Sequence, residues 1–167
     1  MVTGGGQGVG RGTGLTLASA GASVVVNDYV AERAEQVAEE VRAAGGDARA
    51  LPFDVTDYPA VLAAFAAAGP VDILVNNAGN AGQQNYAMSL FMNTEPADWD
   101  RYLGVNLYGV MYCTRAALPG MAERGNGRII TIVSEAGRSG EPQLAADSAA
   151  KAGAAGFMRS IAQEGGR

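Results

Sequence analysis

The sequence predicts an α/β fold, in which a doubly wound parallel sheet carries helices on both faces. Short β-branched runs alternate with helical patterns along the chain, and these runs lack the polar alternation of half-exposed strands. A glycine-rich turn joins the first strand signal to the first helical pattern. A chain of 167 residues with 48% hydrophobic side chains can bury one core, so a single domain over 1–167 is expected.

The elements of the first half follow from this alternation. Met1-Val2 predicts a vestigial first strand, and the helical pattern after it ends near Gly21. Residues 22–27 (ASVVVN) predict a buried strand. Apolar residues then recur at spacings of 4, 3 and 4, which predicts an amphipathic helix ended by two glycines. The apolar positions of that helix are Val30, Ala34, Val37 and Val41, and the glycines are Gly45 and Gly46.

The second half continues the same rhythm. A strand is expected at 48–53, followed by a helix with Thr56 as its N-cap and with Val61, Leu62 and Phe65 as its apolar positions. The remaining predicted elements are a strand at 71–75, an irregular polar connection at 80–96, a long helix at 97–122, a strand at 128–133 and a final helix at 147–164.

Composition excludes several kinds of function. The net charge is −5 and no Lys/Arg cluster occurs, so neither nucleic acid nor an anionic membrane is an expected partner. The chain has no histidine, which excludes a His-based catalytic dyad and a His metal site, and no metal is expected. Cys113 has no second cysteine to pair with, and no signal peptide or membrane span is visible. A cytoplasmic location is therefore expected.

A glycine-rich turn, TGGGQGVG at 3–10, is the first stretch that indicates a ligand. Its glycines follow the spacing T-G-x-x-x-G-x-G through Gly4, Gly8 and Gly10, with Gln7 and Val9 between them. Glycines let a ligand approach the backbone, and the helix that follows offers unpaired N–H groups to a phosphate. The pattern predicts a pyrophosphate site, although a glycine loop without a ligand would look the same.

Asp28 supports a dinucleotide. It follows the second strand, 18 residues after Gly10, where a carboxylate accepts hydrogen bonds from adenosine ribose hydroxyls and repels a 2′-phosphate. Gln7 stands where a basic residue could have met that phosphate. Both features favour NAD over NADP. Taken alone, an acid at the position of Asp28 is more often a cap at the strand end, so Asp28 is weighed together with the glycine turn.

Several separated motifs together resemble the short-chain dehydrogenase/reductase family, NAD(P)-dependent oxidoreductases with a Rossmann-type sheet. The matching pieces are TGGGQGVG (3–10), Asp28, the pair Asp54-Val55, NNAG (76–79), Asn106, Ser134 and Lys151. Their order and spacing both match, and they span the whole chain. The resemblance implies hydride transfer between NAD(H) and an alcohol or ketone, with hydroxyacyl or oxoacyl compounds as one candidate class.

The resemblance also implies roles for the cofactor-binding positions. The turn that contains Gly4, Gln7, Gly8, Val9 and Gly10 would hold the pyrophosphate, and Asp28 would bind the adenosine ribose. Asp54 and Val55 would lie at the adenine edge. The backbone of Asn77, Ala78 and Gly79 would pass near the cofactor, and Lys151 would hold the nicotinamide ribose.

Ser134, Lys151 and Asn106 match three of the four catalytic positions of the family. Ser134 would orient the substrate oxygen, and Asn106 would keep a water in the proton relay. At the fourth position the family has a tyrosine four residues before the lysine, and this chain has Asp147. Lys151 is expected to lower the pKa of Asp147, leaving it ionised and a poor proton donor. Impaired turnover is therefore expected. A simpler interpretation, which gives Asp147 no catalytic role, is an ordinary intrahelical ion pair between Asp147 and Lys151.

The chain also looks incomplete beside this family. Relatives carry a full first strand, and they continue beyond the helix that bears Lys151. We expect a partial domain in which the middle of the sheet is largely unpaired, with marginal stability as the result.

Two other functions stay open on these residues. One is a noncatalytic NAD-binding or oligomerising protein, since relatives pair as homodimers or homotetramers through the helices at 97–122 and 147–164. The other is a methyltransferase that uses S-adenosylmethionine, which also places a glycine turn after its first strand and an acid after its second.

Overall fold

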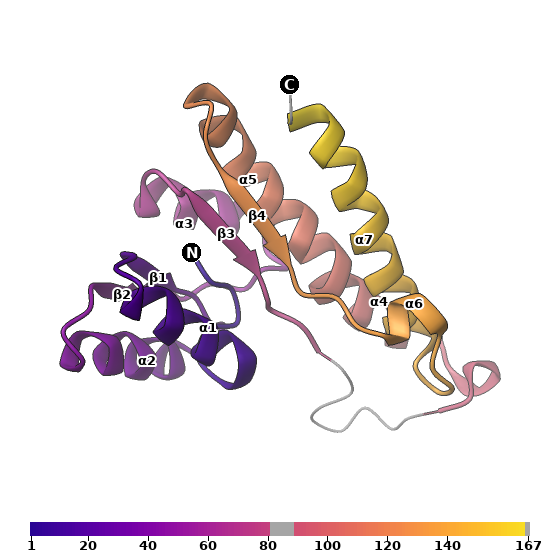
Figure 1. Cartoon of the computed structure of the whole chain (residues 1–167). Coiled ribbons are helices and arrows are strands. Elements are labelled where there is room, and N and C mark those ends of the chain that lie inside the picture. The colour runs from indigo at the N-terminus through magenta and orange to yellow at the C-terminus, as the bar shows by residue number, and fades with distance from the viewer. Residues whose placement is uncertain (81–88, 166–167) are drawn as a thin grey trace.

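The computed structural model describes residues 1–80 and 89–165. A twisted parallel sheet runs through the molecule with helices on both of its faces, as Figure 1 shows. The predicted α/β fold is therefore confirmed. No helix in the described part of the chain is long and apolar enough to cross a membrane.

Four named strands form the two halves of the sheet. β1 (Val24–Val26) pairs in parallel with β2 (Ala48–Ala50), and β3 (Ile73–Asn76) pairs in parallel with β4 (Arg128–Thr131). Each lies within a run that the sequence predicts as a strand, except that β3 begins two residues later and ends one later than 71–75. β1 is a buried run of three valines and β3 is largely buried, whereas β2 has the sequence Ala-Arg-Ala and β4 alternates exposed and half-buried residues.

Met1 to Thr3 joins the two halves in the middle of the sheet. Val2 bridges both Val26 and Val75 in parallel. Its N–H donates to Val25 O at 2.9 Å, and the Thr3 N–H donates to Val75 O at 3.0 Å. The first strand is as short as expected, but the unpaired middle predicted for the sheet is wrong, because this segment bonds to both neighbours.

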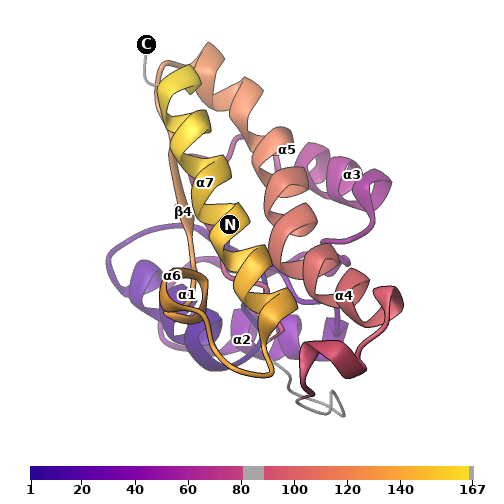
Figure 2. The same ribbon diagram turned by 90° about the vertical axis from the view of Figure 1, so that its right-hand side faces the viewer.

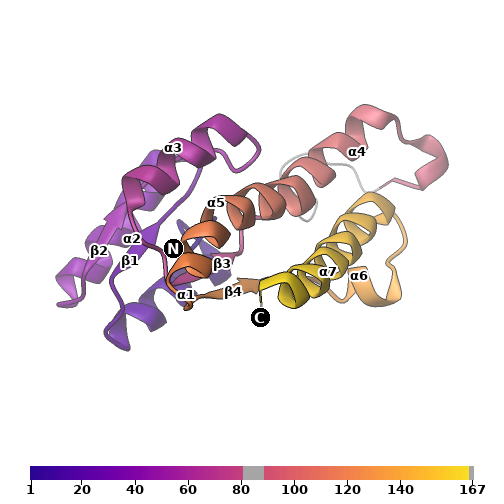
Figure 3. The same cartoon turned by 90° about the horizontal axis from the view of Figure 1, so that it is seen from above.

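Alternate strand residues point into two separate hydrophobic clusters. Val24 and Val26 pack with α1 (Gly8–Ser19) and α2 (Ala31–Ala43), whereas Val25 packs on the opposite face. That opposite face is covered by α3 (Tyr58–Ala68) and α5 (Gly109–Glu123). Figure 3 shows the helices on the two sides of the strands. The doubly wound arrangement follows from the two-residue period of strand side chains.

Three details of the helices differ from expectation. The N-cap of α3 is Asp57, not Thr56, because the Asp57 carboxylate accepts from the Ala60 N–H at 3.1 Å. Leu62 is 43% exposed rather than buried. The short helix α6 (Ala136–Ser139) was not predicted at all. The cap is a choice between two adjacent residues that can both accept from the first turn, whereas the exposure of Leu62 depends on which neighbouring elements cover α3.

The long helix predicted at 97–122 is not uniform. It consists of α4 (Pro96–Leu103), a π-helical turn η2 (Gly104–Tyr108) and α5, and a short 3₁₀ turn η1 (Phe91–Asn93) precedes it. The final helix, α7 (Ala145–Gly165), begins two residues before the predicted 147–164 and ends one residue after it. α7 lies beside α4 and α5, as Figure 2 shows.

Candidate active site

The glycine-rich turn runs from the central Met1–Thr3 segment into α1. Gly4 and Gly8 have φ of 60° and 53°. A Cβ on Gly10 would lie 2.3 Å from Gly4 O and 2.4 Å from Asn77 Nδ2, so no side chain fits there. Gln7 precedes α1 without a side-chain hydrogen bond to the first helical N–H groups. The turn therefore leaves the start of α1 open to an anion, as a pyrophosphate site requires.

The NNAG stretch holds this turn in place. The Asn77 side chain donates to Thr3 O at 2.9 Å and to Gly4 O at 3.0 Å. The Thr3 hydroxyl accepts from the N–H groups of Asn77 and Ala78 at 3.0 and 3.1 Å. Contacts across more than 70 residues of sequence thus connect the end of β3 to the glycine turn. The Asn77 side chain supports the turn rather than pointing freely into it.

Asp28 lies at the end of β1 against the same turn. It is 3% exposed, and its two carboxylate oxygens accept from the N–H groups of Gly6, at 3.2 Å, and Val30, at 3.0 Å. Arg33 also lies close by, since a Cβ on Gly6 would be 2.7 Å from Asp28 Oδ2 and 2.6 Å from Arg33 Cβ. Asp28 therefore serves as the strand-end cap while presenting a carboxylate beside the turn.

Asp54 and Val55 have different surroundings. Asp54 is exposed and accepts from the Thr56 N–H and hydroxyl, both at 2.8 Å. Val55 is 6% exposed and packs in the core, where a Cβ on Gly109 would meet its Cγ2 at 2.8 Å. The Val55 side chain is thus committed to packing, which leaves its backbone as the part that could face a ligand.

A buried polar centre forms around Asn106 in the π-helical turn. Its side-chain nitrogen donates to Asp147 Oδ1 at 2.7 Å and to Asn80 O at 2.8 Å. Its side-chain oxygen accepts from the Asn80 N–H at 3.0 Å. Asn106 and Asp147 are 0% and 2% exposed. The structure therefore brings two of the predicted catalytic positions into direct contact.

Lys151 lies one helical turn beyond Asp147 on α7. Its ammonium donates to Ile132 O at 3.1 Å. A Cβ on Gly79 would lie 3.2 Å from Lys151 Nζ and 3.0 Å from Asn106 Oδ1, so the backbone at Gly79 passes close to both side chains. Within the described residues, no Asp147–Lys151 ion pair is formed, and the alternative of a simple intrahelical pair is wrong.

Burial controls the charge of this centre. Burial raises the pKa of the Asp147 carboxyl, and the negative charge of Glu141 adds to this rise. The positive charge of Lys151 lowers the pKa, but its effect is smaller than that of burial. Burial also lowers the pKa of Lys151, with Asp147 acting in the opposite direction. The expectation that Lys151 would lower the pKa of Asp147 below its ordinary value is therefore wrong. Desolvation outweighs the nearby charge.

Ser134 follows β4 and precedes α6. Its hydroxyl oxygen accepts from the Ala136 N–H at 3.2 Å. Three residues later, Gly137 rests on α7, where an added Cβ would be 2.8 Å from Lys151 Cβ and 2.9 Å from the Ala152 nitrogen. α6 thereby holds the segment that carries Ser134 against the part of α7 that carries Lys151.

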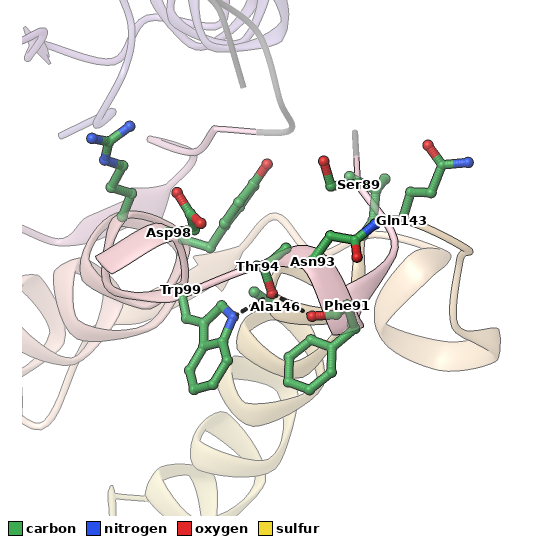
Figure 4. A pocket seen from close by; sticks show the side chains of 12 residues that line it. Ser89, Phe91, Asn93, Thr94, Asp98, Trp99, Gln143 and Ala146 are labelled. Atoms are coloured by element: carbon green, nitrogen blue, oxygen red, sulfur yellow. Dashed lines mark hydrogen bonds between the residues drawn. The ribbon is translucent and has the colours of Figure 1, made fainter. Parts of the chain in front are cut away.

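Asn80 and the residues of a nearby pocket are not among the site residues predicted from the sequence. Asn80 Oδ1 is buried and has no partner among the described residues. Its only sequence signal is its place directly after NNAG. A pocket of about 290 Å³ lies between η1, α4 and the start of α7, with Phe91 and Trp99 among its lining residues (Figure 4). Nothing in the periodicity of 80–96 indicates that pocket.

The tyrosines of the long helix do not replace the missing phenol. Tyr112 packs against Tyr58 of α3, with ring centroids 4.9 Å apart, and Tyr108 stacks on Tyr112 at 6.2 Å. Both thus belong to a row of rings that runs toward α3, while Asp147 lies on α7. Tyr102 lines the pocket instead.

Comparison with known proteins agrees with this geometry. The sequence model described as short chain dehydrogenase matches residues 1–167. A solved metagenomic short-chain oxidoreductase in complex with NADP has a TM-score of 0.90 and 36% identity, covering 98% of this chain and 74% of that one.

Three named relatives have similar identities. A 3-oxoacyl-[acyl-carrier-protein] reductase of Synechocystis is 38% identical over 98% of this chain, and a 7alpha-hydroxysteroid dehydrogenase of Escherichia coli is 36% identical over 97%. A peroxisomal hydratase-dehydrogenase-epimerase of Neurospora crassa is 40% identical over the whole chain. The chain spans 66%, 63% and 18% of these relatives' own lengths, respectively.

Proposed function

Because the chain belongs to the short-chain dehydrogenase family, whose members are NAD(P)-dependent oxidoreductases, we propose that it binds NAD(H) and acts on an alcohol or ketone at low turnover. Family membership removes the methyltransferase alternative. The low turnover is specific to this chain, since Asp147 stands at the position of the family's tyrosine.

The glycine turn supports a dinucleotide. Side chains at Gly4 and Gly10 would collide with neighbouring backbone, and the start of α1 is left without a side-chain cap. The turn from Gly4 through Gln7, Gly8 and Val9 to Gly10 would hold the pyrophosphate. The rest of the dinucleotide would lie along the backbone of Asn77 to Gly79 and of Asp54-Val55. Lys151 would hold the nicotinamide ribose. NAD(H) would supply or accept the hydride.

Asp28 favours NAD over NADP. Its carboxylate is fixed against the turn by two backbone N–H groups, where a 2′-phosphate would meet a negative charge. Arg33 is the feature that favours NADP, because its Nη1 is buried without a partner among the described residues. We give Asp28 more weight because its carboxylate is placed by hydrogen bonds to the glycine turn itself.

The proton transfer is where this site differs. Oxidation of an alcohol requires a base for the hydroxyl proton, and reduction of a ketone requires an acid. Ser134 would orient the substrate oxygen, and Lys151 would favour a negative charge nearby. The Asp147 carboxylate, however, is shorter than a phenol and is held by Asn106 at 2.7 Å. This hydrogen bond is the single observation that carries the proposal, because it directs Asp147 toward the helix η2 and away from a substrate.

Replacing Asp147 by tyrosine tests the proposal. Asp147→Tyr should raise NAD-linked turnover of alcohols or ketones by about 100-fold or more, the range of a restored general acid–base. Asp147→Asn is the matched control, because it keeps an oxygen that can accept from Asn106 and lacks the phenol. Calorimetric NAD binding should be similar in all three proteins. A tyrosine variant that folds, binds NAD and gains no turnover would refute the assignment.

A noncatalytic role is the second candidate, and the same hydrogen bond favours it. With Asn106 and Asp147 bonded to one another, the site keeps its cofactor turn while lacking a free acid–base group. NAD binding without turnover in the unaltered chain and in the tyrosine variant would select this role. Pairing of subunits through α4, α5 and α7 would accompany either function, and sedimentation measurements report it directly.

The cellular location stays a prediction. Cys113 is fully buried, and its burial raises the thiol pKa to about 12, so the thiol is protonated and unreactive at neutral pH. This supports the role of core filler in a reducing, cytoplasmic environment.

A further inference from the structure

We infer that the pocket between η1, α4 and the start of α7 binds the non-reacting body of the substrate, and that this body is a neutral, compact ring system. The inference rests on the proposed function only in that it treats the bound compound as the substrate. Binding of such a compound to the pocket can be measured without NAD and without turnover.

A flat aromatic wall forms one side of the pocket. The rings of Phe91 and Trp99 lie side by side (Figure 4). They stack with centroids 5.1 Å apart and planes at 19°. Trp99 Nε1–H donates to the Thr94 hydroxyl at 2.8 Å, and that hydroxyl donates to Phe91 O at 2.8 Å. The polar atom of the indole is thus satisfied by the protein. Phe91 is 55% exposed, so a ligand that covers it removes apolar surface from water.

The charges of the pocket favour a neutral ligand. Among the described residues that line it, Asp98 and Arg101 have opposite charges. The Asp98 carboxylate already accepts from the Glu95 N–H at 3.0 Å in the capping box of α4. Asn93 and Gln143 add uncharged hydrogen-bonding groups. A carboxylate or phosphate would therefore find no cationic surplus, whereas a ring with a peripheral hydroxyl would find partners.

The size of the pocket favours a small body. A volume of about 290 Å³ is at the lower end of the range for small-molecule sites, roughly 300 to 1,000 Å³. One or two fused rings match that space and a flat wall, because a rigid ring buries its face without the loss of chain freedom that an acyl tail suffers.

The pocket adjoins the polar centre through two connections. The Asn80 side chain donates to Arg101 O at 3.1 Å, and Asn80 is itself bonded to Asn106. Ala146 lines the pocket, and the next residue is Asp147. Gln143, in the turn before α7, has φ of 68°, a strained value for a residue other than glycine. The side of the pocket that contains Gln143 therefore has a backbone conformation that its residue type disfavours, and such conformations are common at ligand-binding sites.

Trp99 provides a direct readout, since it is the single tryptophan of the chain. Its fluorescence should be titrated, without cofactor, with decalone, a saturated fused-ring ketone, and with decanone, a straight-chain ketone of the same carbon number. Phe91→Ala removes the wall. Met92→Ala is the matched control, because Met92 is in the same 3₁₀ turn and does not line the pocket. Circular dichroism confirms that each variant is folded.

Decalone should change the Trp99 emission saturably and bind at least several-fold more tightly than decanone. Phe91→Ala should weaken decalone about tenfold, the loss expected from one aromatic wall, and Met92→Ala should not weaken it. Equal affinities for the two ketones, equal effects of the two variants, or no saturable response would each overturn the inference. Calorimetry with NAD distinguishes failure of this inference from failure of the proposed function. If the chain binds NAD and shows no response to decalone, the inference about the pocket is overturned and the proposed function stands. If it binds decalone and not NAD, the proposed function is overturned and the assigned ring-binding pocket stands.

Discussion

At the scale of single residues, Asp147 shows how burial and charge compete. Its carboxylate lies one helical turn from an ammonium, a spacing that by itself lowers a carboxyl pKa. The side chain is nevertheless turned into the protein, where it accepts from Asn106 and loses contact with water. Desolvation then dominates, and the pKa rises. The same residue is a structural partner of the π turn, and its burial sets the direction of its pKa shift.

This raised pKa predicts a pH effect on stability. Between its ordinary value of 3.8 and its higher folded value, the folded chain binds more protons at Asp147 than the unfolded chain. The stabilising contribution is complete below pH 3.8 and is lost as the pH rises through the folded pKa. Asp147→Asn should therefore flatten the pH dependence of the free energy of unfolding in the acid range, measured with urea. Asp100→Asn, on an exposed site of α4, should leave it unchanged.

Asp28 predicts a change of cofactor preference. Asp28→Asn keeps an oxygen for the Val30 N–H and removes the negative charge beside the turn. NAD affinity should fall about tenfold, and NADP affinity should rise relative to it, with Arg33 nearby to receive the phosphate. Calorimetry with both nucleotides measures the ratio. Asp47→Asn, an exposed site before β2, is the control; an unchanged ratio in Asp28→Asn would exclude the assigned role.

At the scale of elements, the π-helical turn decides where Asn106 points. The Gly109 N–H bonds to Gly104 O, one residue further back than in an α-helix. This extra residue places the Asn106 side chain in the buried centre. Gly109 also packs tightly on Val55. The turn therefore joins the polar centre to the strand-end segment that contains Asp54-Val55.

Two glycines predict opposite effects of the same substitution. Gly109→Ala would put a Cβ 2.8 Å from Val55 Cγ2 and should destabilise the fold by about 1 to 3 kcal/mol. Gly12→Ala, in α1 with nothing within 4 Å of the added atom, should stabilise it by about 0.5 to 1 kcal/mol. Urea unfolding gives both values. A stabilised Gly109→Ala would show that the π turn is not tightly packed.

At the scale of the whole molecule, the start of the chain lies in the middle of the sheet. The Met1 ammonium donates to Ile73 O at 2.7 Å, and Met1 is 8% exposed. Burial lowers the pKa of this ammonium from 8.0 to about 6, with Asp72 opposing the shift. Ile130 of β4 remains 48% exposed. Marginal stability of the chain thus stays a prediction. Its expected causes are the buried ammonium and the exposed apolar surface of β4, since the middle of the sheet is paired.

The buried ammonium gives this prediction a measurable pH signature. Between about pH 6 and 8 the unfolded chain binds more protons at Met1 than the folded chain, so stability should rise with pH by roughly 2 kcal/mol. Neither a histidine nor Cys113 contributes in this window, because the chain has no histidine and the pKa of Cys113 is about 12. Unfolding of the 167-residue chain in urea at several pH values measures the rise. Acetylation of the Met1 nitrogen should abolish it; a slope that survives acetylation would point to another group.

Much of the fold was predictable because it depends on local patterns. The period of apolar residues placed α2 and the buried strands, and the glycine spacing placed the turn before α1. Two candidate site residues taken from the sequence, Asn106 and Asp147, lie together in the structure, and their catalytic roles stay predictions. The direction in which the Asp147 pKa is shifted could not be predicted, because it depends on how far the surrounding helices exclude water from the carboxyl group.

The sequence by itself determined the α/β class, the family, the glycine turn and the presence of Asp147 where the family has a tyrosine, because each is encoded by residue type and spacing along the chain. Only the tertiary structure decided the bonding of Asn106 to Asp147, the pairing of Val2 in the sheet, the part played by Asn80 and the aromatic pocket. These depend on residues far apart in sequence, such as Asn106 and Asp147, whose sequence separation is 41. Their approach is set by how the helices pack, and packing is not a local property.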